Sequence, residues 1–431
     1  MNICVQGLWH LGSVTAACLA AAGHHVIGFD AEFEVVDRLG VAKAPLFEPG
    51  LDDLIEAGIA NGNLRFTTSL EDAAKNADLL WVAYDTPVDD DDVADVNFVF
   101  NSVKKLLPFL RDQSVILISS QMPVGSTLEL EKWAKENIPD RNLYFAYSPE
   151  NLRLGKALDV FQNPDRIIVG VNNSHAKELI EKILLPITSR VEWMSIESAE
   201  MTKHAINAFL ATSVTFANEI ASICELVGAD AKEVERGLKT EARIGPKAYL
   251  SPGGPFAGGT LARDIEFLGL VSKGKNLITP LLSSVRASND EHKNWVRRKL
   301  LDHFGSLEGR KIAIWGLTYK PGTDTLRRSL AVELYYWLVQ KGAQVHFFDP
   351  VVKRLPSTWA GIVTQHETAL SAVGMVDALV IGTEWPEFKN EALKLLPLVK
   401  NDLLVIDPNR YLNSEIGGKL INYRAVGSLG K

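Results

Sequence analysis

Cysteine is scarce in this sequence, and long uninterrupted apolar runs are missing. The 431 residues include only Cys4, Cys18 and Cys224, an odd and widely separated set. Such a set argues against a disulfide scaffold and a cysteine-rich metal site, and it is typical of a reducing compartment. No apolar run approaches the roughly 20 residues that span a bilayer. No basic segment precedes the apolar helix predicted over residues 13–22, so a secretory signal is not expected either. We therefore expect a cytoplasmic protein with no metal site and no membrane partner.

Charge of one sign is not in large excess. Lys and Arg number 45 and Asp and Glu number 53, for a formal net charge of −8. This balance gives no bulk electrostatic reason to bind nucleic acid, although it allows a local basic pocket for a diphosphate. Hydrophobic residues make up 46% of the chain, an ordinary share for a globular protein, and the length allows two or three domains.

Strand and helix patterns alternate along the first part of the chain, residues 1–196. Helical patterns such as Leu51–Ala57 and Phe98–Leu107 separate the strand-like runs. This alternation predicts a parallel, doubly wound sheet. The acidic run 89–92 is expected to be a solvated loop. The strand-like runs are residues 2–6, 25–29, 79–84, 115–119, 143–146 and 167–171.

The middle and last parts of the chain have different patterns. Residues 197–297 show helical periodicity without strand-like runs, which predicts a central helical domain. Strand–helix alternation resumes over residues 298–431, with strands expected at 311–315, 344–348, 378–381 and 403–406. We therefore predict an α/β protein in which two Rossmann-like, doubly wound parallel-sheet domains are joined by a central helical domain.

The turn Gly7-Leu-Trp-His-Leu-Gly12 lies between a predicted strand and a predicted helix, where a dinucleotide fingerprint belongs. Gly7, Leu11 and Gly12 are therefore candidate cofactor-binding residues. Asp30 ends the next strand at about the spacing expected for an acid that holds the adenosine ribose. Because its carboxylate would repel a 2′-phosphate, we expect NAD rather than NADP. The middle glycine is replaced by Trp9, whose ring either covers the cofactor, points away or blocks binding.

Six further motifs are distributed along the chain. They are Pro45–Leu51, Lys203-His-Ala-Ile-Asn207, Arg243-Ile-Gly-Pro-Lys247, Phe256-Ala-Gly-Gly-Thr-Leu-Ala-Arg-Asp264, Gly316-Leu-Thr-Tyr-Lys-Pro-Gly-Thr-Asp324 and Thr383–Phe388. Together these motifs resemble the UDP-glucose/GDP-mannose dehydrogenase family, and the resemblance runs from Asn2 to about Gly427. The family oxidises the C6 alcohol of a nucleotide sugar to a carboxylate with NAD, which implies a role in supplying a polysaccharide or modified-sugar pathway.

The resemblance implies a set of catalytic residues. Lys203 and Asn207, four apart on one helical face, would stabilise the oxyanion at the C6 oxygen. Asp264 would work with Lys203 in deprotonating the alcohol, and Glu150 would lie in the active site. The alternatives are a solvated Lys203 and an Asp264 that caps the helix after it.

The resemblance also implies binding residues. Thr86, Gln121 and Arg327 are expected near the cofactor. Tyr249, Lys320 and Arg410 are expected at the nucleotide-sugar substrate. Arg243 would reach the substrate of a partner subunit, which implies a homodimer.

The chain departs from the family at positions that support the second oxidation. Thr260 stands where the family has its catalytic cysteine, Leu154 where it has a second glutamate, and Gln121 where it has a threonine. A threonine hydroxyl needs a strong base to attack an aldehyde, whereas a thiolate forms near neutral pH. The departures predict that the second oxidation is impaired or altered.

Three alternatives stay open at this point. The enzyme stops at the aldehyde or works around it, or it completes a four-electron oxidation through the hydrated aldehyde. In the third alternative, the chain is a catalytically silent relative that binds nucleotide sugar and NAD and has a regulatory role. Trp9, and Asp85 at a position where the family usually has glycine, predict weakened NAD binding. The motifs do not select the nucleotide or the sugar.

Overall fold

The computed structural model describes residues 1–87, 94–150, 152–356, 359, 363–398, 402–420 and 422–428. The acidic run 89–92 lies outside these residues. The chain divides into two compact units, Met1–Ala205 and Ile206–Lys431. The finer division into parts 1–196, 197–297 and 298–431 stays a prediction.

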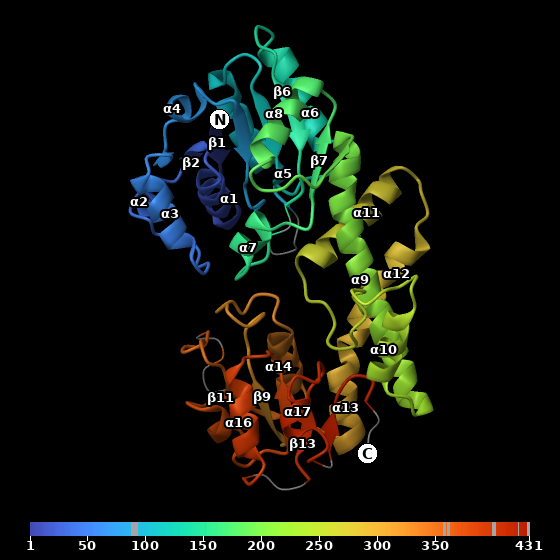
Figure 1. Cartoon of the computed structure of the whole chain (residues 1–431). Helices are drawn as coiled ribbons and strands as arrows, with labels where there is room; N and C mark the ends of the chain where they lie inside the picture. The colour runs from blue at the N-terminus through green and yellow to red at the C-terminus, as the bar shows by residue number, and fades with distance from the viewer. Residues whose placement is uncertain are drawn as a thin grey trace. The chain divides into compact units, whose positions relative to one another are not determined.

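The first unit is built on an eight-stranded sheet (Figure 1). The strands from β3 to β6 are parallel, as the alternating pattern predicts. Two of the strands, β3 and β8, were not predicted from the sequence. In spatial order the strands are β3 (Leu64–Thr67), β2 (His25–Phe29), β1 (Asn2–Gln6), β4 (Leu79–Val82), β5 (Val115–Ile118), β6 (Tyr144–Tyr147), β7 (Ile167–Val171) and β8 (Val191–Met194).

The prediction of a wholly parallel sheet is wrong at one pair of strands. β7 runs antiparallel to β6, with Tyr147 opposite Gly170, and β8 is parallel to β7. The connection over residues 148–166 enters β7 at the end of the sheet where β6 finishes. Because this connection does not cross to the opposite end of the strands, β7 must run in the reverse direction to β6.

Helices cover both faces of this sheet. Because side chains alternate along a strand, Ile3 and Val5 face one helical layer and Cys4 faces the other. The first layer contains α1 (His10–Ala21), α2 (Phe33–Gly40), α3 (Leu51–Ala60), α7 (Ala157–Gln162) and α8 (Ser174–Leu184). The second contains α4 (Leu70–Ala74), α5 (Val96–Leu106), η1 (Leu107–Phe109), α6 (Ser126–Asn137) and the start of α9 (Ile196–Val227).

Helix α9 runs from the first unit into the second. Among the described residues it is the one helix long and apolar enough to cross a membrane, judged by length and composition. The sequence reading found no such run. Within the first unit α9 carries buried Glu200, whose carboxylate accepts hydrogen bonds from Gly125 N, Thr127 N and Thr127 Oγ1. Long helices that are partly buried in a protein core also meet this test.

The second unit begins with the helical part that the sequence predicts. A small core of α9, α11 and α12 side chains, including Ala211, Ile265 and Val285, holds it together. After α9 the helices are α10 (Ala231–Thr240), α11 (Thr260–Gly274), α12 (Pro280–His292) and α13 (Asn294–Phe304).

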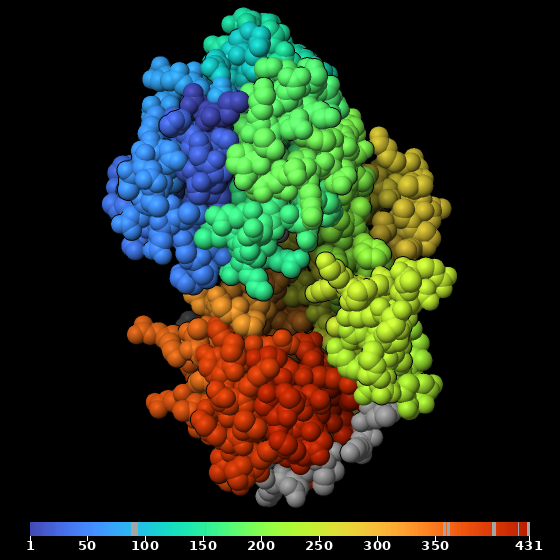
Figure 2. Space-filling model, in the orientation of Figure 1, coloured from blue at the N-terminus to red at the C-terminus, as the bar shows by residue number. Residues whose placement is uncertain are grey.

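A six-stranded parallel sheet follows in the same unit. In spatial order it contains β11 (Val363–Gln365), β10 (Gln344–Phe348), β9 (Lys311–Trp315), β12 (Ala378–Ile381), β13 (Leu404–Ile406) and β14 (Tyr423–Arg424). The helices α14 (Leu330–Gln340) and α13 cover one face. The other face is covered by α15 (Ala369–Val373), α16 (Glu387–Leu395) and α17 (Asn413–Ile416). In the space-filling view, the yellow-green α10 segment lies against this orange-to-red part (Figure 2). The predicted fold class is confirmed.

Candidate active site

The turn between β1 and α1 requires glycine at two positions. Gly7 has φ +88°, and a Cβ there would lie 2.6 Å from the ring of Tyr84. A Cβ on Gly12 would lie 1.6 Å from the carbonyl oxygen of Gly7. Leu11 is buried between them at the start of α1. This close approach of strand and helix is the geometry of a dinucleotide-binding turn.

Asp30 lies at the carboxyl end of β2, beside this turn. Its Oδ2 accepts a hydrogen bond from Leu8 N at 2.8 Å, and its Oδ1 accepts one from Glu32 N at 3.0 Å. The carboxylate is therefore fixed next to the fingerprint, where an acid that binds the ribose is expected. Its contact with the cofactor stays a prediction.

Trp9 stands at the position of the middle glycine. The residue is 48% exposed, and it precedes α1 without making a side-chain hydrogen bond to the helix end. The turn therefore keeps its glycine-dependent shape although the middle glycine is missing. On this geometry the residues of the turn fit a dinucleotide.

Asp85 follows β4, close to the same turn. The backbone N–H groups of Leu11 and His10 favour ionisation of its carboxyl. Solvent reaches the residue, but the surrounding protein desolvates the carboxyl and raises the pKa of Asp85. The next residue, Thr86, donates a hydrogen bond through Oγ1 to the carbonyl oxygen of Gln121 at 2.8 Å. The predicted cofactor residues Thr86 and Gln121 therefore lie together.

Glu48 is a buried residue of this region that the sequence reading did not single out. Its Oε2 lies 2.9 Å from His10 Nε2, and its two oxygens accept hydrogen bonds from Gly155 N and Ala157 N at 2.8 Å. Burial opposes ionisation of Glu48, but the hydrogen bonds from His10 and these N–H groups outweigh it and lower its pKa. Glu48 thereby ties the fingerprint to the start of α7.

Lys203 and Glu150, two predicted catalytic residues of the first unit, are in contact. The Lys203 side chain is buried, and its Nζ donates a hydrogen bond to the Glu150 carbonyl oxygen at 2.5 Å. The Nζ also lies 3.9 Å from Glu150 Oε2. Burial raises the pKa of Glu150, while the charge of Lys203 acts in the opposite direction. The alternative that Lys203 is a solvated surface residue is therefore wrong.

Asn207 and Asp264, two predicted catalytic residues of the second unit, are also in contact. Asn207 Nδ2 donates a hydrogen bond to Asp264 Oδ2, and both side chains are buried. Asp264 lies inside α11, which begins at Thr260 and follows Gly259 at its N-cap position. The alternative that Asp264 caps this helix is therefore wrong.

Thr260 is the exposed first residue of α11. The preceding Gly259 has φ +109°, and a Cβ there would lie 3.5 Å from Arg328 Nη1 and 3.8 Å from Tyr319 Oη. The loop that contains these two residues also carries the predicted residues Lys320 and Arg327, both exposed. The structure thus brings this loop to the start of α11.

The three cysteines lie in hydrophobic cores. Cys18 packs in one core of the first unit and Cys4 in the other, and Cys224 lies in the core between α9 and the second sheet. Burial raises the pKa of Cys4 well above its usual range and that of Cys18 to about 12. These two thiols do not form thiolates near neutral pH.

The loop 251–256 before α11 is held by polar side chains from helices. Gly253 N donates to Asn218 Oδ1 at 2.9 Å, and His292 Nε2 lies 2.8 Å from the Gly253 carbonyl oxygen. Asn289 Oδ1 accepts a hydrogen bond from Phe256 N at 2.9 Å, and Asn289 Nδ2 donates one to the Phe256 carbonyl oxygen at 2.8 Å. The sequence reading missed these residues. The sequence signal for such residues is a polar side chain at a helix position that is otherwise apolar and buried.

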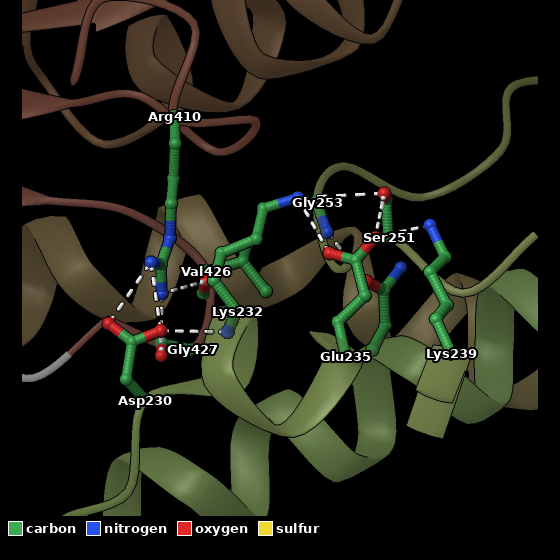
Figure 3. A network of polar contacts seen from close by, with 10 residues as sticks. Asp230, Lys232, Glu235, Lys239, Ser251, Gly253, Arg410, Val426 and Gly427 are labelled. Carbon is green, nitrogen blue, oxygen red and sulfur yellow. Dashed lines mark hydrogen bonds and ion pairs between the residues drawn. The ribbon is translucent and has the colours of Figure 1, made fainter. Parts of the chain in front are cut away.

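Arg410, predicted at the substrate, is engaged within the second unit (Figure 3). Its Nη1 lies 3.0 and 3.1 Å from the two oxygens of Asp230, and its Nη2 donates to the Gly427 carbonyl at 2.8 Å. In the same view, Glu235 accepts hydrogen bonds from Lys232, Lys239 and Ser251. Arg410 therefore joins the helical part to the second sheet, and its contact with a substrate stays a prediction.

Arg243 and Tyr249 lie at the surface of the second unit. The Arg243 side chain is 88% exposed. Among the ion pairs of the described residues, its one partner is nearby Glu241, at 2.9 Å. Tyr249 is 59% exposed. Their roles toward substrate stay predictions. Among the described residues, no group of three or more His, Cys, Asp or Glu side chains could hold a metal ion.

The fold and the first-unit turn define a class of protein: a dinucleotide-dependent oxidoreductase with two Rossmann-type sheets and a helical part between them. Comparison with known families makes this specific. The NAD-binding, central and UDP-binding domains of the UDP-glucose/GDP-mannose dehydrogenase family match residues 1–188, 197–291 and 313–414, respectively. The chain belongs to this family, and its cofactor is NAD.

Individual relatives cover nearly the whole chain. The UDP-glucose 6-dehydrogenase of Pseudomonas aeruginosa is 32% identical over 442 residues, which cover 99% of this chain and 97% of that protein. The corresponding enzyme of Rhizobium meliloti is 34% identical and covers 99% of both chains. The solved structure of a UDP-glucose dehydrogenase from Pyrobaculum islandicum matches with a TM-score of 0.87 at 27% identity, covering 99% of this chain and 97% of that one. These findings confirm a nucleotide-sugar dehydrogenase.

Proposed function

We propose that this chain oxidises C6 of a UDP- or GDP-hexose of the UDP-glucose type to the aldehyde, and that the second oxidation is impaired. The proposal is supported by the burial of all three thiols in hydrophobic cores, together with the resemblance, which puts Thr260, the first residue of α11, at the position of the family cysteine. The names of the relatives support UDP-glucose as the first substrate to test.

The first oxidation uses residues that the chain retains. The alcohol gives a hydride to NAD and a proton to the protein, and the products are an aldehyde and NADH. Lys203 and Asn207, one turn apart on α9, stabilise the C6 oxygen as its negative charge develops. Asp264, with Lys203, receives the proton. Buried side chains suit these roles because charge–dipole interactions are stronger where water is excluded.

The second oxidation lacks its usual chemical groups. A threonine hydroxyl attacks a carbonyl only with a dedicated base, and Leu154 neither accepts a proton nor orients water. Another route remains, in which water adds to the aldehyde and the resulting gem-diol gives a hydride to a second NAD and two protons to solvent. This route forms the carboxylate slowly and without a covalent intermediate.

The proposal is tested by identifying the product. Wild-type protein, NAD and a panel of UDP- and GDP-hexoses are incubated with hydroxylamine, which traps aldehydes as oximes, and the products are analysed by mass spectrometry. We expect the oxime to dominate. Dominant uronate in the presence of the trap would overturn the impaired second step. Measurable nucleotide-sugar binding with no NADH would instead support a catalytically silent relative with a regulatory role.

Restoring the family residues tests the cause. The triple variant Thr260→Cys, Leu154→Glu, Gln121→Thr should form more uronate than wild type, because it regains a nucleophile and a group that activates water. Thr260→Ser is the control, since it also changes the side chain but supplies no thiol. Equal uronate formation by the two variants would contradict the assignment of these positions.

We further propose a homodimer in the cytoplasm that supplies a polysaccharide or modified-sugar pathway. Phe209, Phe216 and Ile223 recur at seven-residue spacing on α9 and are each about half or more exposed, which suits a helix-mediated contact between copies. The exposed Arg243 could then reach the partner's substrate. The unpaired thiols fit a reducing compartment.

A further inference from the structure

Side chains from three parts of the second unit bind the backbone of residues 252–256, the loop before α11. Two of these residues are prolines and have no N–H group. Each of the other three N–H groups donates to the amide oxygen of an asparagine. The bonds run from Gly253 N to Asn218 Oδ1 at 2.9 Å, from Gly254 N to Asn409 Oδ1 at 2.6 Å and from Phe256 N to Asn289 Oδ1 at 2.9 Å. Asparagines of α9, α12 and the segment after β13 therefore set the path of this loop.

Asn289 holds both backbone groups of Phe256. Besides the bond to its Oδ1, its Nδ2 donates to the Phe256 carbonyl oxygen at 2.8 Å. The residue is 3% exposed on α12, one turn before His292, whose Nε2 lies 2.8 Å from the Gly253 carbonyl oxygen. A buried amide that both accepts from and donates to one residue fixes the two peptide planes that flank that residue.

Phe256 lies where the loop meets the hydrophobic core of the helical part. It packs against the core of α9, α11 and α12 that includes Ala208 and Ile265. Ala208 directly follows Asn207, and Ile265 directly follows Asp264. Because protein cores are closely packed, the position of Phe256 affects how α9 and α11 meet beside the Asn207–Asp264 hydrogen bond.

The segment between Phe256 and α11 has little stiffness of its own. It reads Ala257-Gly258-Gly259, and glycine loses more conformational freedom on folding than any other residue. Gly259 also has φ +109°, in the region that favours glycine. The start of α11 therefore needs an anchor in the preceding chain, and Asn289 supplies it at Phe256.

We propose that Asn289 is a positioning residue for the first hydride transfer. By holding Phe256 it fixes where the chain enters α11, and thereby the orientation of the Asp264 carboxylate that receives the proton of the C6 alcohol. The inference rests on the proposed function, in which Asp264 has this role. It is independent of how far the oxidation proceeds, and it assigns Asn289 no contact with substrate or cofactor.

The test is Asn289→Asp, which keeps the acceptor for Phe256 N but replaces the donor by an oxygen that repels the Phe256 carbonyl. NADH formation from UDP-glucose is measured with saturating NAD, well below the unfolding temperature of each protein. We expect kcat to fall about 10- to 100-fold, since a displacement of about 1 Å in an active site can cost 100-fold. KM for UDP-glucose should change by less than about threefold, because the bond acts on the reacting geometry. Residues 257–264 should exchange their amide hydrogens faster than in wild type.

Asn63→Asp is the matched control. Asn63, in the first unit, also donates from Nδ2 to a backbone carbonyl, that of Ala20 at 2.8 Å. Ala20 lies at the opposite end of α1 from the turn between Gly7 and Gly12. The control variant adds the same charge and loses the same kind of bond, so it should lower stability but leave kcat unchanged. If Asn289→Asp does not fold, the smaller uncharged change Asn289→Ser takes its place with the same expectation for kcat.

The new carboxyl also offers a rescue that a merely structural role would not show in kcat. Burial raises the pKa of a carboxyl, and once protonated the group again donates to the Phe256 carbonyl. The kcat of Asn289→Asp, divided by that of wild type at the same pH, should therefore rise as the pH falls from about 8 to about 6. His292 on α12 and Asp264 on α11 are present in both proteins, so the division removes their own titration.

The outcomes separate this proposal from the one on which it rests. A wild type that forms no NADH from any nucleotide sugar overturns the proposed function and this assignment with it. An active wild type whose kcat is unchanged in Asn289→Asp, or reduced equally in Asn63→Asp, overturns the assignment of Asn289 alone. Unchanged hydrogen exchange over residues 257–264 would also overturn it, because the entry into α11 would then not depend on Asn289.

Discussion

The amide of Asn207 donates a hydrogen bond to the buried carboxylate of Asp264, joining α9 to α11 within the second unit. This contact fixes the Asp264 carboxylate in one orientation and satisfies a buried amide. If Asp264 is also the proton acceptor in the first oxidation, its charge and its structural role can be separated by substitution.

Asp264→Asn should lower kcat for NADH formation by about 100-fold or more, because general-base catalysis is typically worth that much. Its unfolding free energy should change little, since the new amide can turn its oxygen toward Asn207. Asp264→Leu should in addition destabilise the protein by about 2 kcal/mol, because it leaves a buried amide without its acceptor. Steady-state kinetics and urea unfolding measure the two effects.

The exposed Asp302→Asn, on α13, is the charge-matched control for these variants. It should retain both activity and stability. Wild-type kcat in Asp264→Asn would contradict the catalytic assignment and leave only the structural role.

Glu235 should stabilise the second unit in a pH-dependent way. Burial opposes its ionisation, but hydrogen bonds from Lys232, Lys239 and Ser251 lower its pKa to about 2, against 4.5 for an ordinary glutamate. Its contribution is therefore fully present above about pH 4.5 and is lost as the pH falls toward about 2. We expect Glu235→Gln to cost about 2 kcal/mol at neutral pH, after allowing for solvent screening of the lysines.

Urea unfolding near pH 7 and near pH 3 checks this expectation. The difference between wild type and Glu235→Gln should shrink at the lower pH. Glu233→Gln, on the exposed face of the same helix, is the control and should change stability by less than about 0.5 kcal/mol. A difference that is independent of pH would show that packing rather than charge is responsible.

Gly253 and Gly254 should respond differently to alanine. A Cβ on Gly253 would lie 2.2 Å from Asn409 Oδ1, whereas one on Gly254 would lie 3.6 Å away. Asn409 cannot move freely because its Oδ1 accepts a hydrogen bond from Gly254 N at 2.6 Å. Gly253→Ala should therefore destabilise the protein by about 1–3 kcal/mol, as measured by urea unfolding. Equal stability of the two alanine variants would refute this account.

The exposed apolar residues Phe209, Phe216 and Ile223 on α9 should be needed for dimerisation. Phe216→Glu places a charge in the middle of this set, and we expect it to convert a dimer to monomers in light scattering. The exposed Glu219→Gln on the same helix is the control. A wild-type protein that is monomeric at micromolar concentration, or an unchanged dimer in Phe216→Glu, would contradict the proposed interface.

Periodicity predicted most of the architecture from the sequence. Apolar runs located β1, β2, β4, β5 and the strands of the second sheet that are buried on both faces. Periodicity did not locate β3, β8, β11 and β14. These strands are short or partly exposed, and their apolar signal is therefore weak. The direction of β7 depends on where residues 148–166 return to the sheet, and local propensity does not encode that path.

The motifs predicted one catalytic set of Lys203, Asn207, Asp264 and Glu150. The contacts of Lys203 with Glu150 and of Asn207 with Asp264 come from the structure. The motifs did not predict the contacts of buried Glu48 with His10, Gly155 and Ala157. These contacts depend on where the carboxylate of one loop meets groups of other segments. Burial of a charged residue, which only the structure reveals, is the physical sign of such contacts.

The central claim is that catalysis stops after the first hydride transfer. It is tested most directly by counting NADH formed per UDP-glucose consumed, with saturating NAD and wild-type protein. The account predicts a ratio close to one, with the aldehyde accumulating. A ratio of two at the rate of the first step would contradict it, because full oxidation would then proceed without the family thiol.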